Sequence, residues 1–410
     1  MIISTSISKL SAEQKFMCSV LIVNAGNYLY NLALGRILGP ELFADAALLI
    51  TFLLIVSFIA MTFQLATAKF SVLFEKEVFT NFVAISYKYA SIAGIALGVA
   101  LIVFAKDLQH MFNTQTHFMF VFFGLGIPVY FIMSVNRGIL QGKNKFDDLA
   151  KTYQGEMISR LIITLVLLYV LSSVQSSIII AIGLVVSFVI GLYPFKTKKE
   201  NLIKKATLCP KDSKRVIRFF VLTAFYECTQ IIINNSDILL VKHYFEEYDA
   251  GLYASLALIG RVVYFVAWMF VMLLLPKVVQ KQKDGEEHTS ILFRYVGYIT
   301  ILAIAIVSGC YLFPETVIKL LFGSEYIFIA PLLWKYAIAT SLFAISNIFA
   351  YYFLSLDRYI PVLLSGILGI SQIVLVVLFH SSLTQVVTMQ IIAMAVLLVV
   401  QGIYFFRFGR

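Results

Sequence analysis

Polar and ionisable side chains that could bind a charged or hydroxyl-rich molecule occur inside long apolar segments of this sequence. Arg261 lies near the centre of the apolar segment 251–275, too deep for its side chain to reach either end. An ionisable group at such a depth costs about 2.5–3.5 kcal/mol on insertion scales and usually faces a cavity or another polar group. Two interpretations stay open: a structural ion pair with an acid such as Asp237, or a cationic contact for an anionic head group.

Two stripes of polar residues accompany Arg261. One follows the spacing i, i+3, i+4, i+7 and consists of Asn24, Asn27, Tyr28 and Asn31. The other follows i, i+3, i+7, i+10 and consists of Glu227, Gln230, Asn234 and Asp237. Each spacing places its residues on one face of a helix. Such stripes also join helices by hydrogen bonds, but two matching stripes favour a shared polar cavity.

Two further groups of ionisable residues are candidates for a function. Glu227 and Asp237 are the candidates for coupling to H+ or Na+. Arg137, Glu156 and Arg160 lie near segment ends, where we expect a solvated interface. A role for Arg137 and Arg160 where substrate enters the protein is the alternative.

The motifs of several enzyme classes are missing. The chain has no Gly-x4-Gly-Lys-Ser/Thr phosphate loop, and its five histidines lack the spacing of zinc ligands. The pair Asp147–Asp148 follows a basic segment at a predicted helix start, where acids favour the helix dipole. The four cysteines show no metal or redox spacing and are interpreted as free thiols. We therefore expect no catalytic residues, no metal and no cofactor, and predict that the chain is not an enzyme.

The elements that position these residues are transmembrane helices. Of the 410 residues, 60% are hydrophobic and 13% charged, whereas a soluble domain has about a quarter charged. About 20 apolar residues form a spanning helix. The apolar runs predict an all-α membrane protein of about 12 spans, at 16–37, 42–68, 82–105, 117–140, 157–173, 177–195, 216–241, 251–275, 291–313, 326–354, 358–380 and 384–406. The breaks at the serine-containing segments 172–176 and 380–384 decide this count.

Orientation follows from the basic residues. With the N-terminus in the cytoplasm, 26 of the 32 Lys and Arg residues lie at or near cytoplasmic ends, nine of them between positions 196 and 218. Since positive charge collects on the cytoplasmic side, we predict that both termini are cytoplasmic. The net charge of +10 is then a mark of topology and not of nucleic-acid binding.

The chain also shows an internal repeat. At an offset of 206 residues Asn24 aligns with Gln230, Asn31 with Asp237 and Arg36 with Lys242. This predicts a six-helix bundle over 1–195, a basic cytoplasmic linker over 196–215 and a second bundle over 216–410. Because each half has an even number of spans, the repeat is parallel, as in many transporters. Within the fourth span, residues 124–128 (GLGIP) predict a weakened helix, either a hinge or a static kink.

Three short motifs resemble a known family. They are NRGILQGKNKF at 136–146, LFPETVIKLLFGSEY at 312–326 and GLYA at 251–254. They are similar to segments of Wzx-type polysaccharide flippases in the multidrug/oligosaccharidyl-lipid/polysaccharide (MOP) exporter superfamily, whose fold is that of the MATE transporters. The resemblance implies two six-helix bundles with alternating access. It also implies transport of an undecaprenyl-diphosphate-linked oligosaccharide from the cytoplasmic to the outer leaflet of a bacterial inner membrane, for O-antigen, lipopolysaccharide, capsule or exopolysaccharide.

Under this hypothesis the spans carrying the two stripes and Arg261 hold the diphosphate and the sugars. Replacement of Arg261 by Ala is then expected to reduce delivery of the glycan without lowering the protein level. The partners are the lipid-linked oligosaccharide, membrane lipids, H+ or Na+ and polysaccharide-assembly proteins, with no nucleic acid. A cation-coupled multidrug exporter of the same superfamily is the alternative. A membrane glycan polymerase or ligase fits less well, because no outer loop is long enough for a catalytic domain.

Overall fold

The fold is described from a computed structural model that covers residues 12–195, 207–264, 267, 274, 278, 281–282, 284–356, 358 and 360–408. Within these residues all regular structure is helical. The helices are α2 (Ala12–Leu73), α3 (Lys76–Val103), α4 (Ala105–Phe112), α5 (Phe118–Gly142), α6 (Phe146–Val170), α7 (Ser176–Gly191), α9 (Pro210–Tyr244), α10 (Glu247–Gly260), α12 (Thr289–Leu312), α13 (Pro314–Leu321), η1 (Ser324–Leu332), α14 (Leu333–Ser355), α15 (Ile360–Leu378) and α16 (Leu383–Phe408).

The predicted spans coincide with these helices. By length and composition, nine helices of the described residues can cross a membrane, and α2 is long enough to contain the first two predicted spans. The sixth span is the shorter apolar helix α7, and the eighth begins with α10 and continues into residues that the structure describes only in part. The prediction of an all-α, multi-pass membrane protein is confirmed.

The chain forms two compact units. Unit 1 contains residues 1–34 and 49–228, and unit 2 contains residues 35–48 and 229–410. The helix α9 therefore begins in unit 1 and ends in unit 2, and a short piece of α2 belongs to unit 2. The predicted boundaries at 195 and 216 stay a prediction.

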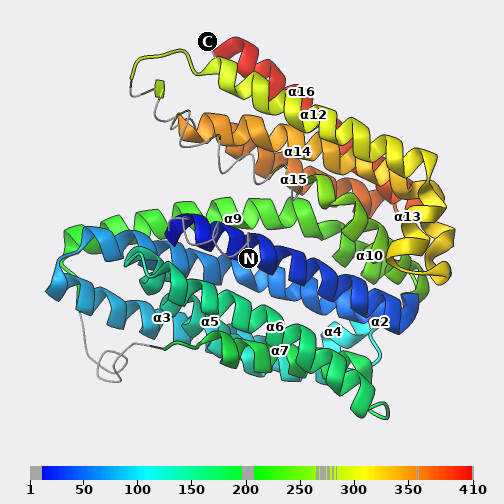
Figure 1. The fold of residues 1–410 in the computed structure, drawn as a ribbon, viewed down its shortest axis with the longest axis horizontal. Helices are drawn as coiled ribbons and strands as arrows, with labels where there is room; N and C mark the ends of the chain where they lie inside the picture. Colours follow the sequence, from blue (N-terminus) through cyan, green and yellow to red (C-terminus); the bar gives the residue numbers. More distant parts are fainter. Residues whose placement is uncertain are drawn as a thin grey trace, which may run out of the picture. The chain divides into compact units, whose positions relative to one another are not determined.

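The two units repeat the same helix order. In unit 1, α3 packs on α5, α5 on α7 and α6 on α7, while in unit 2 α12 packs on α14, α14 on α16 and α15 on α16 (Figure 1). A strongly amphipathic helix of 8 residues follows the first member of each series, α4 after α3 and α13 after α12. This common order agrees with the predicted parallel repeat.

Serine-containing turns separate the two helices of two consecutive pairs, as predicted. The helices α6 and α7 are separated by residues 171–175, and α15 and α16 by residues 379–382. At the start of α16 the Gln385 backbone N–H donates to Ser382 Oγ at 3.2 Å, and the Gln385 side chain accepts from the Ser381 N–H at 2.9 Å. Side chains thus satisfy backbone groups that a helix start leaves unpaired.

A bend divides α2 into two helices. Gly39 has φ 73° and ψ 172°, a conformation open to glycine, and Pro40 follows it. Residues 35–48 around the bend pack inside unit 2. Tyr326 donates to the Gly35 carbonyl at 2.7 Å, and Lys242 Nζ lies 2.9 Å from Asp45 Oδ1 in a fully buried ion pair. We name residues 35–48 the α2 tip.

The glycines of the fourth span serve packing instead of breaking the helix. The helix α5 runs without interruption through Pro128. A Cβ on Gly124 would lie 2.8 Å from the Gly98 carbonyl oxygen of α3, and one on Gly98 would lie 2.5 Å from the Gly124 carbonyl oxygen. The weakened helix predicted from the sequence is therefore a site of close approach between α3 and α5.

Candidate functional site

Unit 1 contains a cluster of two arginines around one acid, which we name the triad: Arg137 of α5 with Glu156 and Arg160 of α6. Arg137 Nη2 lies 2.7 Å from Glu156 Oε2, and Arg160 Nη2 pairs with Glu156 Oε1. Glu156 and Arg160 are four residues apart, so one helical face presents both. Two positive charges share one negative charge.

The triad is buried. Its three residues are 4%, 8% and 9% exposed, in chain order. The expectation of a solvated interface is therefore wrong, because α5, α6 and α7 pack closely around these side chains. The alternative, that Arg137 and Arg160 act where substrate enters, stays a prediction.

The two arginines of the triad differ in how completely they are bound. Arg137 donates from Nε to Thr152 Oγ1 and from Nη2 to the Thr152 carbonyl, both at 3.0 Å, and its guanidinium lies 4.0 Å from the centre of the Tyr153 ring. Arg160 donates from Nη1 to Asn27 Oδ1 at 3.5 Å, but its buried Nε has no hydrogen-bond partner among the described residues. Arg160 is thus the group of the triad with an unused donor.

The α2 stripe lies partly beside the triad. Asn27, Tyr28 and Asn31 are half-buried and Asn24 is exposed. Asn27 contacts Arg160, and Asn31 donates to the Asn27 carbonyl at 2.8 Å. The structure therefore brings one member of the predicted stripe onto an arginine that the sequence placed at an interface.

Unit 2 contains a second cluster, around Asp237 of α9. Arg261 Nη2 lies 3.0 Å from Asp237 Oδ1 and Nη1 donates to Asn235 Oδ1 at 3.3 Å. The other carboxylate oxygen accepts from Tyr336 at 2.8 Å and from Tyr253 at 3.1 Å. Asp237 is 2% exposed. Of the two readings of Arg261, the geometry corresponds to the ion pair with Asp237.

A small cavity borders this second cluster. Its polar lining consists of Asn234, Asp237, Arg261, Thr340, Gln372 and Gln390. With a volume of ≈ 30 Å³ it has room for ordered water and not for a sugar ring. Gln372 Oε1 is buried there without a hydrogen-bond partner in the described part of the chain. The cavity therefore offers hydrogen-bonding groups that the protein itself leaves unused.

The α9 stripe runs through both units. Glu227 is half-buried in unit 1, whereas Gln230 and Asp237 are buried and Asn234 is half-buried in unit 2. Asn234 donates to the Gln230 carbonyl at 2.8 Å, the same local bond that Asn31 makes in α2. The structure unites Asp237 and Asn234 with Arg261 in one cluster and leaves Glu227 apart from it.

Several residues of the two clusters were not singled out from the sequence. Thr152 and Tyr153 support Arg137, and Tyr253 and Tyr336 support Asp237. A tyrosine or threonine in an apolar helix is common, so its type alone gives no signal. Gln372 and Gln390 do give a signal in the sequence, because an amide at membrane depth needs a hydrogen-bond partner just as Arg261 does.

Metal binding has no support in the described residues, where no group of three or more His, Cys, Asp or Glu side chains comes together. All four cysteines are free, as predicted.

Solved structures with the same fold are found at low sequence identity. An inward-facing multidrug resistance MATE family transporter of the MOP superfamily matches with a TM-score of 0.76 at 13% identity, over 94% of this chain and 95% of its own. The lipid II flippase MurJ in an inward closed conformation matches with 0.74 at 16% identity, over 96% and 87%. The fold is therefore one that a transporter and a lipid flippase share.

Sequence comparisons add a relative and a family. A membrane protein of Methanocaldococcus jannaschii with no characterized function is 24% identical over 257 residues, and the match spans 59% of each chain. A family model described as polysaccharide biosynthesis protein matches residues 33–331, more than half of the sequence. The chain thus belongs to this polysaccharide biosynthesis family, as a multi-pass membrane protein with the fold of the MOP superfamily.

Proposed function

We propose that this protein is a flippase that carries a polyprenyl-diphosphate-linked oligosaccharide from the cytoplasmic to the outer leaflet of a bacterial inner membrane. The observation that carries the proposal is the triad. In this buried site two arginines face one glutamate, so one positive charge has no negative partner among the described residues. Moving an anion through a medium of low dielectric is prohibitive unless a counter-charge meets it. A diphosphate arriving at Arg160 would supply the missing negative charge.

Arg160 is the residue that we assign to the diphosphate. Its unused Nε and its long bond to Asn27 leave donors for phosphate oxygens, and a guanidinium binds phosphate through paired hydrogen bonds. Arg137 positions Glu156, since its Nε and Nη2 donate to Thr152 and Glu156. The exposed and half-buried amides of the α2 stripe would then contact sugar hydroxyls, which accept and donate neutral hydrogen bonds.

Arg261 takes a different part in this proposal from the one expected at the outset. It is neutralised by Asp237, so an anion would gain contact with Arg261 only by breaking an existing ion pair. The same pair occupies Asp237, one of the two acids predicted for H+ or Na+ coupling, the other being Glu227. This occupancy counts against Asp237 as a coupling site, and a cation-coupled exporter would have to rely on Glu227.

The test is export in a strain that lacks the chromosomal gene and carries a plasmid copy. Arg160→Gln is expected to lower surface polysaccharide by at least about tenfold, the effect of losing roughly 1.4 kcal/mol of binding, and to accumulate the lipid-linked oligosaccharide. The matched control is Arg294→Gln, an exposed arginine of α12, which should export normally. Normal surface polysaccharide in the Arg160→Gln strain, at equal protein level, would refute the proposal. Changed resistance to dyes without any change in polysaccharide would support the exporter.

A further inference from the structure

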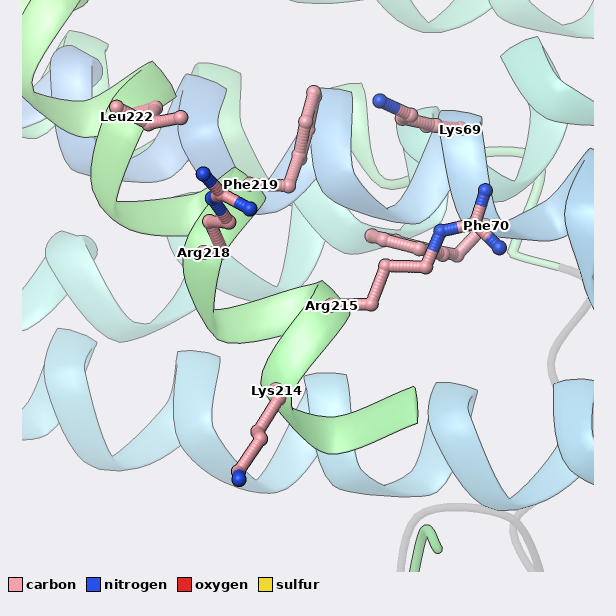
Figure 2. Close-up of a pocket in the computed structure, with 7 residues that line it drawn as sticks. All are labelled: Lys69, Phe70, Lys214, Arg215, Arg218, Phe219 and Leu222. Atoms are coloured by element: carbon pink, nitrogen blue, oxygen red, sulfur yellow. The ribbon is translucent and has the colours of Figure 1, made fainter. Parts of the chain in front are cut away.

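A basic pocket that the proposed mechanism does not use lies in unit 1, between the end of the second half of α2 and the start of α9. Its volume is ≈ 370 Å³. Four cationic side chains line it, Lys69 of α2 and Lys214, Arg215 and Arg218 of α9 (Figure 2). All four are exposed. By the predicted orientation this end of both helices is cytoplasmic.

Local structure directs most of these groups toward the pocket. Arg215, Arg218 and Leu222 share one face of α9, at i, i+3 and i+7. Lys69 Nζ lies 4.1 Å from the centre of the Phe219 ring, a cation–π contact that joins α2 to α9. In Figure 2 the Arg215 side chain extends toward Phe70 on α2, whereas Lys214 points away from α2.

The charge of the pocket is unbalanced. None of its seven lining residues carries a carboxylate, although each of the two buried clusters is built around one. Uncompensated lysine and arginine side chains at a concave surface concentrate anions. Arginine binds phosphate oxygens in pairs, and two arginines one turn apart suit two linked phosphate groups.

The remaining lining is apolar and points to a ligand with a hydrocarbon part. Phe70, Phe219 and Leu222 complete the pocket, and Leu222 is 55% exposed. On the same turns of α9 but outside the pocket lining, Ile217 and Val221 are also exposed, each at 59%. A free inorganic anion gains nothing from these groups, whereas a lipid can lay its chain along them while its head group meets the arginines.

We propose that this pocket binds the diphosphate head group of a polyprenyl-linked glycan at the cytoplasmic membrane surface, before the head group reaches Arg160. This inference rests on the proposed function. A diphosphate diester brings two negative charges to one place, and the head group of an ordinary anionic phospholipid brings one. The four cations and the cavity between them fit the more highly charged ligand.

Binding to the purified full-length protein in detergent tests the proposal, with radiolabelled undecaprenyl diphosphate retained on immobilised protein as the probe. The variant Arg215→Gln/Arg218→Gln should bind the lipid at least about tenfold more weakly. The control Lys88→Gln/Lys211→Gln removes two exposed charges outside the pocket, from α3 and α9, and should bind as the unmodified protein does. Both variants have the same net charge, so general electrostatic attraction cannot produce a difference between them.

Two competition arms identify the source of the phosphate. Unlabelled phosphatidylglycerol in mixed micelles and inorganic diphosphate should each displace the probe poorly. Equal competition by phosphatidylglycerol would assign the pocket to bulk phospholipid, and equal competition by inorganic diphosphate would assign it to a free anion. Either result overturns the proposal, as does unchanged binding by Arg215→Gln/Arg218→Gln.

Export measured in parallel separates this inference from the proposed function. A protein that binds undecaprenyl diphosphate through Arg215 and Arg218 but exports no glycan refutes the proposed function and not the site. A double variant with unchanged binding, beside an Arg160→Gln variant that loses export, refutes the site and not the function.

Discussion

The two units each bury an arginine against an acid, and they balance the charge differently. In unit 1 Glu156 serves both Arg137 and Arg160, so the triad keeps a surplus positive charge. In unit 2 Asp237 serves Arg261 and also accepts from two tyrosine hydroxyls, so the charges are equal and both carboxylate oxygens accept hydrogen bonds. The same residue types therefore make an open site in one unit and a closed one in the other.

The difference shows that the depth of an arginine in the membrane does not predict how its charge is balanced. Arg261 is the deepest arginine by sequence, yet its pair with Asp237 is complete. The sequence placed Arg160 near the end of a span, and its buried Nε has no hydrogen-bond partner among the described residues. A buried ion pair costs desolvation of both partners, and removal of one partner alone is more damaging than replacement of both. The predictions below use this asymmetry.

The largest effect is expected from Glu156→Gln. This change leaves Arg137 and Arg160 buried without a counter-charge, which should cost about 3–5 kcal/mol of unfolding free energy. Thermal unfolding of the purified protein in detergent measures the loss. Glu315→Gln, at an exposed acid of α13, is the control and should change stability by less than about 1 kcal/mol. An unfolding temperature for Glu156→Gln equal to that of the control would show that the triad is not buried as described.

The next largest effect is the difference in unfolding free energy between Arg261→Gln and Arg160→Gln. Arg261→Gln leaves Asp237 with only its two tyrosine donors and should cost about 3 kcal/mol. Arg160→Gln leaves Glu156 paired with Arg137 and should cost less than about 1.5 kcal/mol. The protein level of Arg261→Gln in membranes should fall accordingly, contrary to the expectation from sequence that the level would hold. Equal losses in the two variants would remove the distinction between an open and a closed cluster.

A smaller effect concerns the tyrosines of the closed cluster. Either Tyr253→Phe or Tyr336→Phe alone should cost less than about 1 kcal/mol, because the other hydroxyl still donates to Asp237. The double variant leaves that oxygen without a tyrosine donor and should cost about 1.5–3 kcal/mol, more than the two single losses added together. A double-mutant cycle by thermal unfolding gives the coupling. Strict additivity would mean that the two hydroxyls act independently.

The smallest effect is expected on the stability of unit 2 at acid pH. His288, just before α12, bonds to the Tyr352 hydroxyl at 2.7 Å. Burial, then the nearby charge of Arg358, lowers the pKa of its imidazole from about 6.5, against an opposite effect of Glu287. The folded state thus favours neutral histidine, and this contribution to stability is present above pH 6.5 and is lost as the pH falls below it. His288→Gln should make the unfolding temperature depend less on pH between pH 8 and 5, whereas His110→Gln in unit 1 should not.

Much of the fold was predictable from apolar runs. Helix ends at the serine-containing turns, the parallel order and the all-α class follow from hydropathy and the even number of spans, because the bilayer imposes both. The role of residues 124–128 was not predictable. Gly and Pro weaken an isolated helix, and only the neighbouring α3 shows that Gly124 serves close packing with Gly98.

The candidate site was predictable in its residue types and not in its pairing. Asp237 with Arg261 was foreseen as one of two readings. The three residues of the triad were singled out, but their burial was not predicted, because a helix end in sequence does not reveal whether it faces water or α7. Burial of Arg137 depends on contacts between residues that lie far apart along the chain, and hydropathy within one span contains no such information.

The α2 tip has a consequence for how the protein is made. Asp45 leaves the ribosome 197 residues before Lys242, its buried partner. At roughly 5–20 residues per second that interval is on the order of ten to forty seconds. Through that time Asp45 lacks its ion-pair partner Lys242, and the Gly35 carbonyl lacks the hydroxyl of Tyr326. The α2 tip is therefore made early and packed late, and a chain stopped before α9 cannot complete its packing.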